Sequence, residues 1–393
     1  MPGSVIVSSA RTPIGKLSGS LASLSATDLG GHAIRAALSR AGITGDQVDY
    51  VYMGQVIQAG AGQMSARQAA NKGGIPLSVP SIGLNKACLS GIDAIYLADQ
   101  MIQAGDAEVV VAGGMESMTQ APYLLKKARE GYRMGNGELL DSLLDDGLMC
   151  GLDGIHMGEG TEKYTQAHGA ITREHMDELS AKSHERAANA AKEGRFTEIE
   201  PIEIPQRKGD PIVIADDEGI RPGTTPESLG GLRAAFAKDG SITAGNASQI
   251  SDGGAAVVVM SREKAEALGV APIAELLSFG LVAGPDTSLL TQPSRAIKRA
   301  LERTDLEVGD VDLFELNEAF AAVGVASMLD LGVSDDIVNV NGGAISLGHP
   351  IGMSGTRVVL TIIDELRRRG GGVGAAALCG GGGQGEAAIV RAL

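Results

Sequence analysis

Two residues stand in sequence contexts that favour chemistry over packing. Cys88 lies in NKACLSGID (85–93), between an apolar strand-like run and a helix-like run. The macrodipole of a helix favours a thiolate at its N-terminus. His349 lies in GHPIGMSG (348–355) before another helix-like run, and an imidazole close to a thiol activates it as a nucleophile. The alternative interpretation is that Cys88 is a small core residue and His349 a hydrogen-bonded loop histidine. Most lone cysteines are buried and unreactive.

A second cysteine, Cys379, ends the apolar run AAALC immediately before four glycines. Such a glycine run lets the backbone approach a ligand and presents bare N–H groups. Residues 380–385 also match G-x-G-x-x-G, but only EAAIVRAL follows, which is too short for a dinucleotide-binding helix and its acidic residue. An oxyanion hole made by glycine amides fits better.

Asn317 begins NEAFA at the end of a strand-like run, where an unpaired amide would be costly. The alternative is a cap for the following helix. Cys150 has no partner pattern and is interpreted as structural, and the spacing of the three cysteines indicates neither a disulfide framework nor a zinc site. The remaining histidines of the central segment are expected to face solvent: His168, His175 and His184.

The chain contains an internal repeat, which must position these residues. Three pairs of segments match at a nearly constant offset: 34–55 with 297–318, 79–102 with 336–363, and 107–114 with 374–381. In this alignment Ser90-Gly91 pairs with Ser354-Gly355, and Cys88 pairs with Gly352. If the two halves pack about a pseudo-twofold axis, two helix N-termini face each other and bring Cys88 and His349 together.

Short apolar runs alternate with amphipathic segments, which indicates buried sheets covered by helices, an α/β architecture. The central part is richer in charge, methionine, proline and turn residues, so we expect an inserted loop domain. It contains one clear helix, 172–194, with Thr172 as N-cap. The expected division is: an N-terminal half of residues 1–119 plus 250–270, an inserted domain of residues 120–249, and a C-terminal half of residues 271–393.

Composition restricts the function classes. The 393 residues are 44% hydrophobic with 56 glycines and no tryptophan, so the core must be aliphatic and closely packed. A net charge of −15 disfavours non-specific binding to nucleic acid or to anionic membranes. No apolar run approaches the length of a membrane span, and the first residues are typical of a strand and turn rather than a signal peptide. A cytoplasmic location is therefore expected.

Four motifs, in order, resemble those of the thiolase family: NKACLSG (85–91), NEAFA (317–321), NGGAISLGHPIGMSG (341–355) and CGGGGQG (379–385). ARTPIGK, AGGMESM and AGNASQISDGGAA also fit, and the resemblance covers the whole chain. It implies the thiolase fold, in which two duplicated βαβ-rich halves form a layered α-β-α-β-α core. It also implies acetyl-CoA C-acetyltransferase activity, the reversible Claisen condensation of two acetyl-CoA to acetoacetyl-CoA and coenzyme A.

The resemblance implies a role for each candidate residue. Cys88 would be the acylated nucleophile, activated by His349. Cys379 would be the second acid/base, which moves a proton at the acetyl methyl group. Asn317 would hold a water that, with His349, stabilises the enolate oxygen, and the amides of Cys88 and Gly381 would surround the thioester carbonyl.

The same resemblance places coenzyme A, as substrate and product, against the inserted domain and its edges, through Leu148, His156, Met157, Arg221, Ser228, Ala244, Ser248, Ala319 and Phe320. Arg221 would meet the adenine or a phosphate, and the apolar members would form a pantetheine tunnel. For Met157, core packing is the alternative. The family needs no separate cofactor or metal, and it suggests tight dimers paired into tetramers through a loop of the inserted domain.

Three positions depart from the family pattern and leave the acyl-chain preference open. Leu89 stands where glycine or alanine is frequent, Gly380 where isoleucine is common, and TSLLTQP around Leu289 lacks a Met-Gly pair. A 3-ketoacyl-CoA thiolase of longer-chain β-oxidation is therefore one alternative. A ketoacyl synthase would carry two active-site histidines, whereas this chain has Asn317 and Cys379. A non-catalytic acyl-CoA- or lipid-binding protein is the remote alternative, since no catalytic position is lost.

Overall fold

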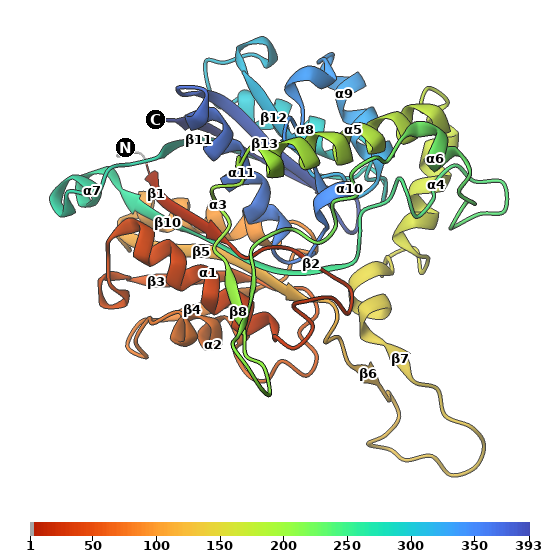
Figure 1. Ribbon diagram of the computed structural model, residues 1–393, viewed down its shortest axis with the longest axis horizontal. Helices are drawn as coiled ribbons and strands as arrows, with labels where there is room; N and C mark the ends of the chain where they lie inside the picture. Colours follow the sequence, from red (N-terminus) through yellow and green to blue (C-terminus); the bar gives the residue numbers. More distant parts are fainter. Residues whose placement is uncertain (1–3) are drawn as a thin grey trace.

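The structure, a computed structural model, describes residues 4–393 and contains one long sheet in the strand order β12-β13-β14-β11-β1-β10-β5-β3-β4, with β2 paired to β10 (Figure 1). The strands of this sheet are β1 (Ser4–Arg11), β2 (Gly15–Lys16), β3 (Tyr50–Gly54), β4 (Ser81–Leu84), β5 (Val109–Ser117), β10 (Ser251–Ser261), β11 (Ala274–Ala283), β12 (Leu313–Leu316), β13 (Gly372–Gly380) and β14 (Gln384–Ala392).

The two halves of this sheet have the same topology. In the N-terminal half β3 runs parallel to β5, and β10 runs antiparallel to both β5 and β1. In the C-terminal half β12 runs parallel to β13, and β14 runs antiparallel to both β13 and β11. The halves join where β1 pairs with β11, through Val5 with Glu275 and Ile6 with Ala274. The predicted internal repeat is confirmed.

Helices cover both outer faces of the folded sheet and fill the space between its halves. On the N-terminal half lie α1 (Ala26–Ala41) and α2 (Ser65–Lys72), and on the C-terminal half lie α8 (Gln292–Leu301) and α9 (Ala321–Leu331). Between them α3 (Ser90–Ala104) and α11 (Ser354–Arg368) contact each other and both halves of the sheet. Every residue of β5 and β10 is buried, as expected for strands covered on both faces. This arrangement is the predicted α-β-α-β-α layering.

The N-termini of α3 and α11 meet at a pair of glycines, as the repeat predicts. A Cβ on Gly91 would lie 2.7 Å from the Thr356 nitrogen, and a Cβ on Gly355 would collide with the Ile92 nitrogen. The Thr356 hydroxyl also donates to the Gly91 carbonyl (3.1 Å). Glycine at both repeat positions is therefore required for the two helices to cross in backbone contact.

The central part of the chain carries most of the remaining elements. The elements of the central part are β6 (Tyr123–Leu124), β7 (Leu140–Asp141), η2 (Leu143–Leu148), α4 (Met157–His168), α5 (Arg173–Lys192), β8 (Ile202–Ile204), β9 (Ile212–Ile214) and α6 (Pro226–Gly230). The other short elements lie outside it: α7 (Arg262–Leu268), α10 (Ala344–Leu347), η1 (Gly45–Gln47), η3 (Val308–Asp310) and η4 (Asp335–Ile337). The predicted helix with Thr172 as N-cap is confirmed, since the Thr172 side chain accepts from the His175 amide. The strands β6 and β7 lead into a long arm that extends away from the body (Figure 1).

The boundaries expected at residues 119, 249 and 270 stay a prediction. Among residues 4–393, no helix combines the length and the apolar character needed to cross a bilayer.

Candidate active site

Cys88 lies at the junction between β4 and α3, half-buried, two residues before the first residue of α3. The turn is fixed by Ser90, whose hydroxyl donates to the Ala87 carbonyl (2.6 Å) and accepts from the Lys86 amide (2.9 Å). Ala87 has φ +50°, a left-handed conformation that is uncommon outside glycine. The Cys88 amide points towards its own sulfur, which favours the thiolate. The predicted position at a helix N-terminus is confirmed.

His349 is buried in the loop between α10 and α11, and its ring is held at one nitrogen. Nδ1 lies 2.6 Å from the Ser354 hydroxyl, which donates its hydrogen to the Pro350 carbonyl (3.0 Å). We therefore assign the ring proton to Nδ1, where Ser354 accepts it, so that Nε2 is left as the base. Burial, reinforced by the Arg357 charge, lowers the pKa of His349 to about 3, so the imidazole is neutral near pH 7.

Cys379 is buried at the end of β13, close enough to Cys88 for the charge of one thiolate to affect the other. Burial raises the pKa of Cys379, and the Cys88 charge raises it further. Burial also raises the pKa of Cys88 to about 12, with a smaller contribution from the Glu116 carboxylate. The expected lowering of the Cys88 pKa is therefore wrong for the substrate-free protein, because desolvation outweighs the stabilisation at the helix N-terminus.

Asn317 is fully buried directly after β12 and faces His349. Its amide nitrogen Nδ2 lies 3.4 Å from Nε2 and 3.5 Å from Nδ1 of the imidazole. Its Oδ1 has no hydrogen-bond partner among the described residues. Since α9 begins at Ala321 with Phe320 as its N-cap, Asn317 does not cap that helix. A buried, unpaired amide oxygen beside an imidazole suits the binding of a polar atom.

Gly381 opens the turn between β13 and β14. A Cβ on Gly381 would lie 3.4 Å from the Ala87 Cβ, so its backbone lies against the Cys88 loop. The structure therefore brings Cys88, Cys379 and Gly381 together at the seam between the two halves, and it pairs Asn317 with His349.

A cavity of about 540 Å³ opens beside His349, between the inserted segment and the two halves. Most of the predicted coenzyme A contacts line it: Leu148, His156, Arg221, Ala244, Ser248, Ala319 and Phe320. Its walls are largely apolar, and the exposed Lys16 and Arg221 place positive charge at its rim. The cavity thus suits a long, mainly apolar chain that ends in an anionic group.

Two predicted contacts do not line this cavity. Met157 is half-buried and packs against the apolar cluster that contains Cys379 and Leu289. Ser228 is exposed on α6, where its hydroxyl donates to the Thr225 carbonyl (2.7 Å) in a capping box.

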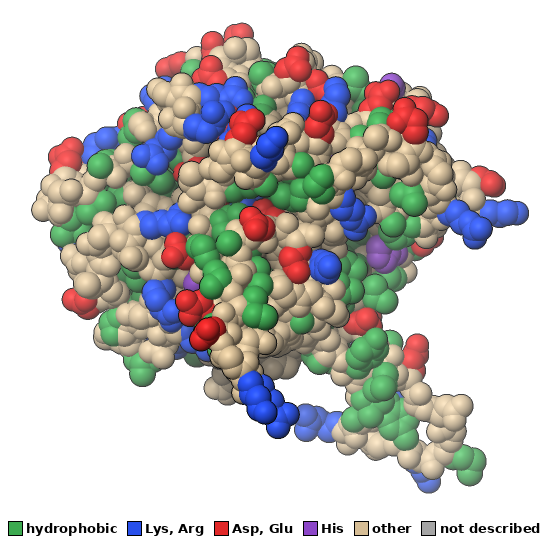
Figure 2. Space-filling view, in the orientation of Figure 1, with side chains coloured by type: hydrophobic (Ala, Val, Ile, Leu, Met, Phe, Trp, Pro, Cys, Tyr) green, Lys and Arg blue, Asp and Glu red, His purple; other side chains and the backbone are tan. Residues whose placement is uncertain are grey.

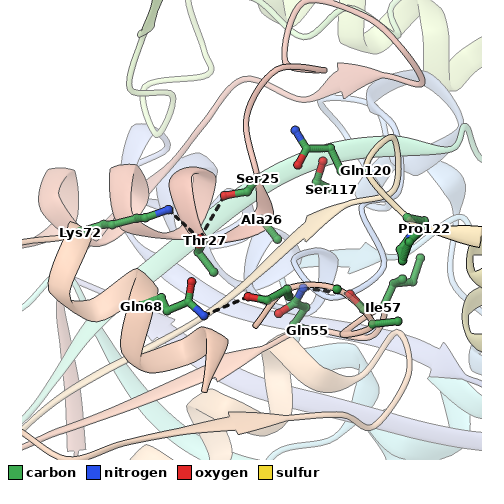
Figure 3. Close-up of a pocket in the computed structure, with 14 residues that line it drawn as sticks. Ser25, Ala26, Thr27, Gln55, Ile57, Gln68, Lys72, Ser117, Gln120 and Pro122 are labelled. Carbon is green, nitrogen blue, oxygen red and sulfur yellow. Dashed lines mark hydrogen bonds between the residues drawn. The ribbon is translucent and has the colours of Figure 1, made fainter. Parts of the chain in front are cut away.

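A smaller pocket of about 270 Å³ lies at the start of α1 and is separate from this seam (Figure 3). Its lining mixes polar and apolar residues, and several of its polar groups bond one another. The Lys72 ammonium donates to the Thr27 hydroxyl (2.8 Å), and the Gln68 amide donates to the Ala61 carbonyl (2.9 Å). None of the predicted site residues lines this pocket, so we assign it no part in the chemistry.

Comparison with known proteins places this geometry in a family. Residues 4–263 match the family model of the thiolase N-terminal domain, and residues 270–392 match that of the thiolase C-terminal domain. The chain belongs to the thiolase family.

Relatives of this thiolase extend over its full length. It is 57% identical to a "Probable acetyl-CoA acetyltransferase" of Mycolicibacterium smegmatis, over 98% of this chain and 100% of that protein. It is 49% identical to an "Acetyl-CoA acetyltransferase" of Cupriavidus necator, over 98% of both. A crystal structure of the Bacillus anthracis acetyl-CoA acetyltransferase superimposes with a TM-score of 0.97 at 40% identity, covering 100% of this chain and 99% of the other.

The thiolase cavity also contains residues that the sequence alone did not reveal. Phe236 stacks on His156 with ring centroids 4.8 Å apart and meets Phe320 edge-on, which builds one apolar wall. The Gln249 side chain donates to the Gly219 and Ile345 carbonyls, and its backbone carbonyl accepts from the His349 amide (3.0 Å). Both residues lie in irregular segments, where no periodicity marks them.

One histidine assignment is wrong. His184 was expected to face solvent, but it is buried, and its Nδ1 accepts from the Arg221 amide (3.1 Å). Burial and the Arg221 charge lower its pKa to about 4. His168 and His175 are exposed, as expected. Cys150 is buried with its thiol 3.8 Å from Asp153, which agrees with a structural role.

No group of three or more His, Cys, Asp and Glu side chains arranged to hold a metal ion occurs within the part of the chain that the structure describes. All three cysteines are free thiols.

Proposed function

We propose that this thiolase is an acetyl-CoA C-acetyltransferase, which condenses two acetyl-CoA reversibly to acetoacetyl-CoA and coenzyme A. Two observations carry this proposal: the closeness of the Cys88 and Cys379 thiols, and an apolar cavity with a basic rim that His349 lines. The names of the full-length relatives support the same activity. Acyl-CoA and coenzyme A are substrates and products, and no further cofactor is invoked.

In the first half-reaction Cys88 becomes acylated. As the thioester carbonyl approaches, His349 Nε2 accepts the thiol proton while Sγ attacks the carbonyl carbon. In this scheme the amides of Cys88 and Gly381 donate to the oxyanion. The C–S bond to coenzyme A breaks, and the imidazolium returns its proton to the departing thiolate. The Cys88 thiol and the His349 imidazole are both neutral at rest, which fits this scheme. The thiolate and the imidazolium form only when a bound substrate can stabilise their charges.

In the second half-reaction His349 Nε2 accepts the Cys379 thiol proton, and the resulting Cys379 thiolate removes a proton from the methyl group of a second acetyl-CoA. The enolate oxygen is stabilised by His349 together with a water held by Asn317. The enolate carbon attacks the acyl carbonyl, a C–C bond forms, and the C–S bond to Cys88 breaks. Cys88 leaves as the thiolate and takes the proton from the His349 imidazolium, while Cys379 keeps the proton from the methyl group. Both thiols and the imidazole thereby return to their neutral forms.

The surroundings of Cys379 favour a short acyl group. Its cluster is made of buried apolar side chains, including Leu289, Leu290, Ala319, Phe320 and Ile345. The test is thiolysis by the purified protein with free coenzyme A, comparing acetoacetyl-CoA with a C8 or C10 3-ketoacyl-CoA. We expect activity on acetoacetyl-CoA alone. Preference for the longer substrate would instead indicate a β-oxidation thiolase, and no thiolysis of either would indicate a non-catalytic protein.

We further propose that the protein works as a homodimer that pairs into tetramers. Strand β4 lies at the end of the sheet and pairs only with β3 among the described strands, and Ile82 on it is 44% exposed. An exposed apolar edge strand is a template for pairing with another copy. The arm beyond β6 and β7 exposes Tyr132, Met134 and Leu139, and its apolar surface stands clear of the body in Figure 2. Such a patch suits a second contact between dimers.

A cytoplasmic location is part of this proposal. Both catalytic thiols must stay reduced to carry an acyl group and a proton, and the cytoplasm keeps thiols reduced.

A further inference from the structure

The loop that carries Cys88 and the strand that carries Cys379 touch through the residues that follow each cysteine. A Cβ on Gly380 would lie 2.6 Å from Leu89 Cγ and 2.9 Å from Leu89 Cδ1. Leu89 is fully buried, so its side chain occupies the space directly above Gly380. The third-nearest atom to this Cβ is also from Leu89, at 3.4 Å. Every other residue therefore lies at van der Waals distance from the Cβ or farther away.

Neighbouring contacts hold the same loop against the hairpin of β13 and β14. The Lys86 ammonium lies 2.8 Å from Glu386 on β14 and 2.6 Å from Asp93 on α3. The backbone of Gly381 lies against Ala87. The loop thus meets this hairpin through Lys86, Ala87 and Leu89. Of these three, Leu89 is the residue whose side chain occupies the space that a side chain at position 380 would need.

We propose that Leu89 is a positioning residue that sets the distance between Cys88 and Cys379 by seating on Gly380. The proposal rests on the proposed function. Acylation uses Cys88 and His349, whereas proton abstraction also needs Cys379 at the correct distance from the acyl group. A displacement of β13 relative to the Cys88 loop should therefore impair condensation much more than acylation.

This contact also accounts for two departures from the family pattern. The leucine at position 89 and the glycine at position 380 are complementary in size, because a side chain at position 380 would collide with the leucine. Neither residue lines the substrate cavity, and Leu89 belongs to the core cluster that contains Ile92, Met353 and Leu378. We expect the exchange of sizes to act on the geometry of the two thiols rather than on the choice of acyl chain.

The test uses Gly380→Ala, Leu89→Ala and the double variant, each measured in two reactions. Acetylation of Cys88 by acetyl-CoA is followed by intact mass, and condensation is followed by formation of acetoacetyl-CoA. For Gly380→Ala we expect condensation to fall on the order of tenfold to a hundredfold while acetylation stays within about threefold, because small misplacements of reacting groups are costly. In Leu89→Ala/Gly380→Ala the clash is removed, so condensation should recover to the level of Leu89→Ala.

Leu360→Ala is the matched control, since Leu360 is a fully buried leucine of the same core cluster on α11, away from the cysteines. It should slow both reactions equally or not at all. Equal losses of acetylation and condensation in Gly380→Ala, or a double variant no better than Gly380→Ala, would overturn the role of Leu89. Failure of the unmodified protein to become acetylated would instead overturn the proposed function.

Discussion

At the Cys88 thiol two opposing effects meet. The N-terminus of α3 and the Cys88 amide favour the thiolate, while burial favours the neutral thiol and raises its pKa to about 12. His349 is neutral as well, because its pKa is lowered to about 3. The resting site is therefore a thiol beside an imidazole, in contrast to a pre-formed ion pair. In the proposed mechanism the Cys88 thiolate is generated by proton transfer when a substrate carbonyl is in place.

The division of work between the sulfurs can be tested with Cys379→Ala. We expect acetyl-Cys88 to form at close to the normal rate, while condensation falls by about a thousandfold or more, because only the second half-reaction needs the second base. Cys88→Ala should abolish both reactions without altering the circular dichroism spectrum. Cys150→Ala, outside the cavity, is the control with normal activity. Loss of acetylation in Cys379→Ala would show that Cys379 also activates the nucleophile.

At the scale of elements, α5 and the Arg221 segment are joined by a buried histidine. His184 has a pKa lowered to about 4, whereas an unfolded histidine titrates near its ordinary value of 6.5. The unfolded state therefore binds more protons than the folded state below pH 6.5, so His184 reduces stability as the pH falls from that value towards 4.

Replacing His184 by a residue that keeps a hydrogen-bond acceptor but does not titrate should reduce the dependence of the unfolding free energy on pH. For His184→Asn we expect the loss of unfolding free energy between pH 7 and pH 4 to be smaller by about 1 to 2 kcal/mol than in the unmodified protein. Urea unfolding at several pH values measures it, with His175→Asn at an exposed position as the control. An unchanged profile would mean that His184 titrates normally in the folded state.

The crossing of α3 and α11 gives a second prediction at this scale. Gly355→Ala would force a methyl group into the Ile92 backbone, and we expect a loss of about 1 to 3 kcal/mol of unfolding free energy together with most of the activity. Gly309→Ala, where a Cβ meets open space, should change neither. Thermal unfolding of both variants distinguishes the cases, and a fully stable Gly355→Ala would show that the helices can separate without cost.

Elements marked by a period or a repeat could be predicted from the sequence, and features set by tertiary surroundings could not. The buried strands β5 and β10 and the crossing at Gly91 and Gly355 followed from apolar runs and matched segments. The raised pKa of Cys88 did not, because desolvation depends on what covers the loop. His184 was misplaced because a charged helix segment says nothing about the Arg221 segment that folds over one of its faces.

At the scale of the whole molecule, the site occupies the seam between two similar halves, and the edge strand β4 leads directly into the Cys88 loop. A partner copy paired at β4 would therefore steady the nucleophile. For Ile82→Asp we expect monomers in light scattering and reduced activity, since a charge at an apolar edge opposes strand pairing. Val213→Asp, at an exposed apolar position on the short strand β9, is the control. An unchanged oligomer would exclude this edge as the interface.

The separation in sequence between the Cys88 loop and the hairpin of β13 and β14 has a consequence for biosynthesis. A ribosome makes the Cys88 segment first, and His349 and Cys379 follow 261 and 291 residues later. The contact of Lys86 with Glu386 and that of Leu89 with Gly380 can form only after β13 and β14 have left the exit tunnel. Until β13 and β14 have been made, the growing polypeptide therefore carries the Cys88 thiol without His349 and Cys379 folded against it.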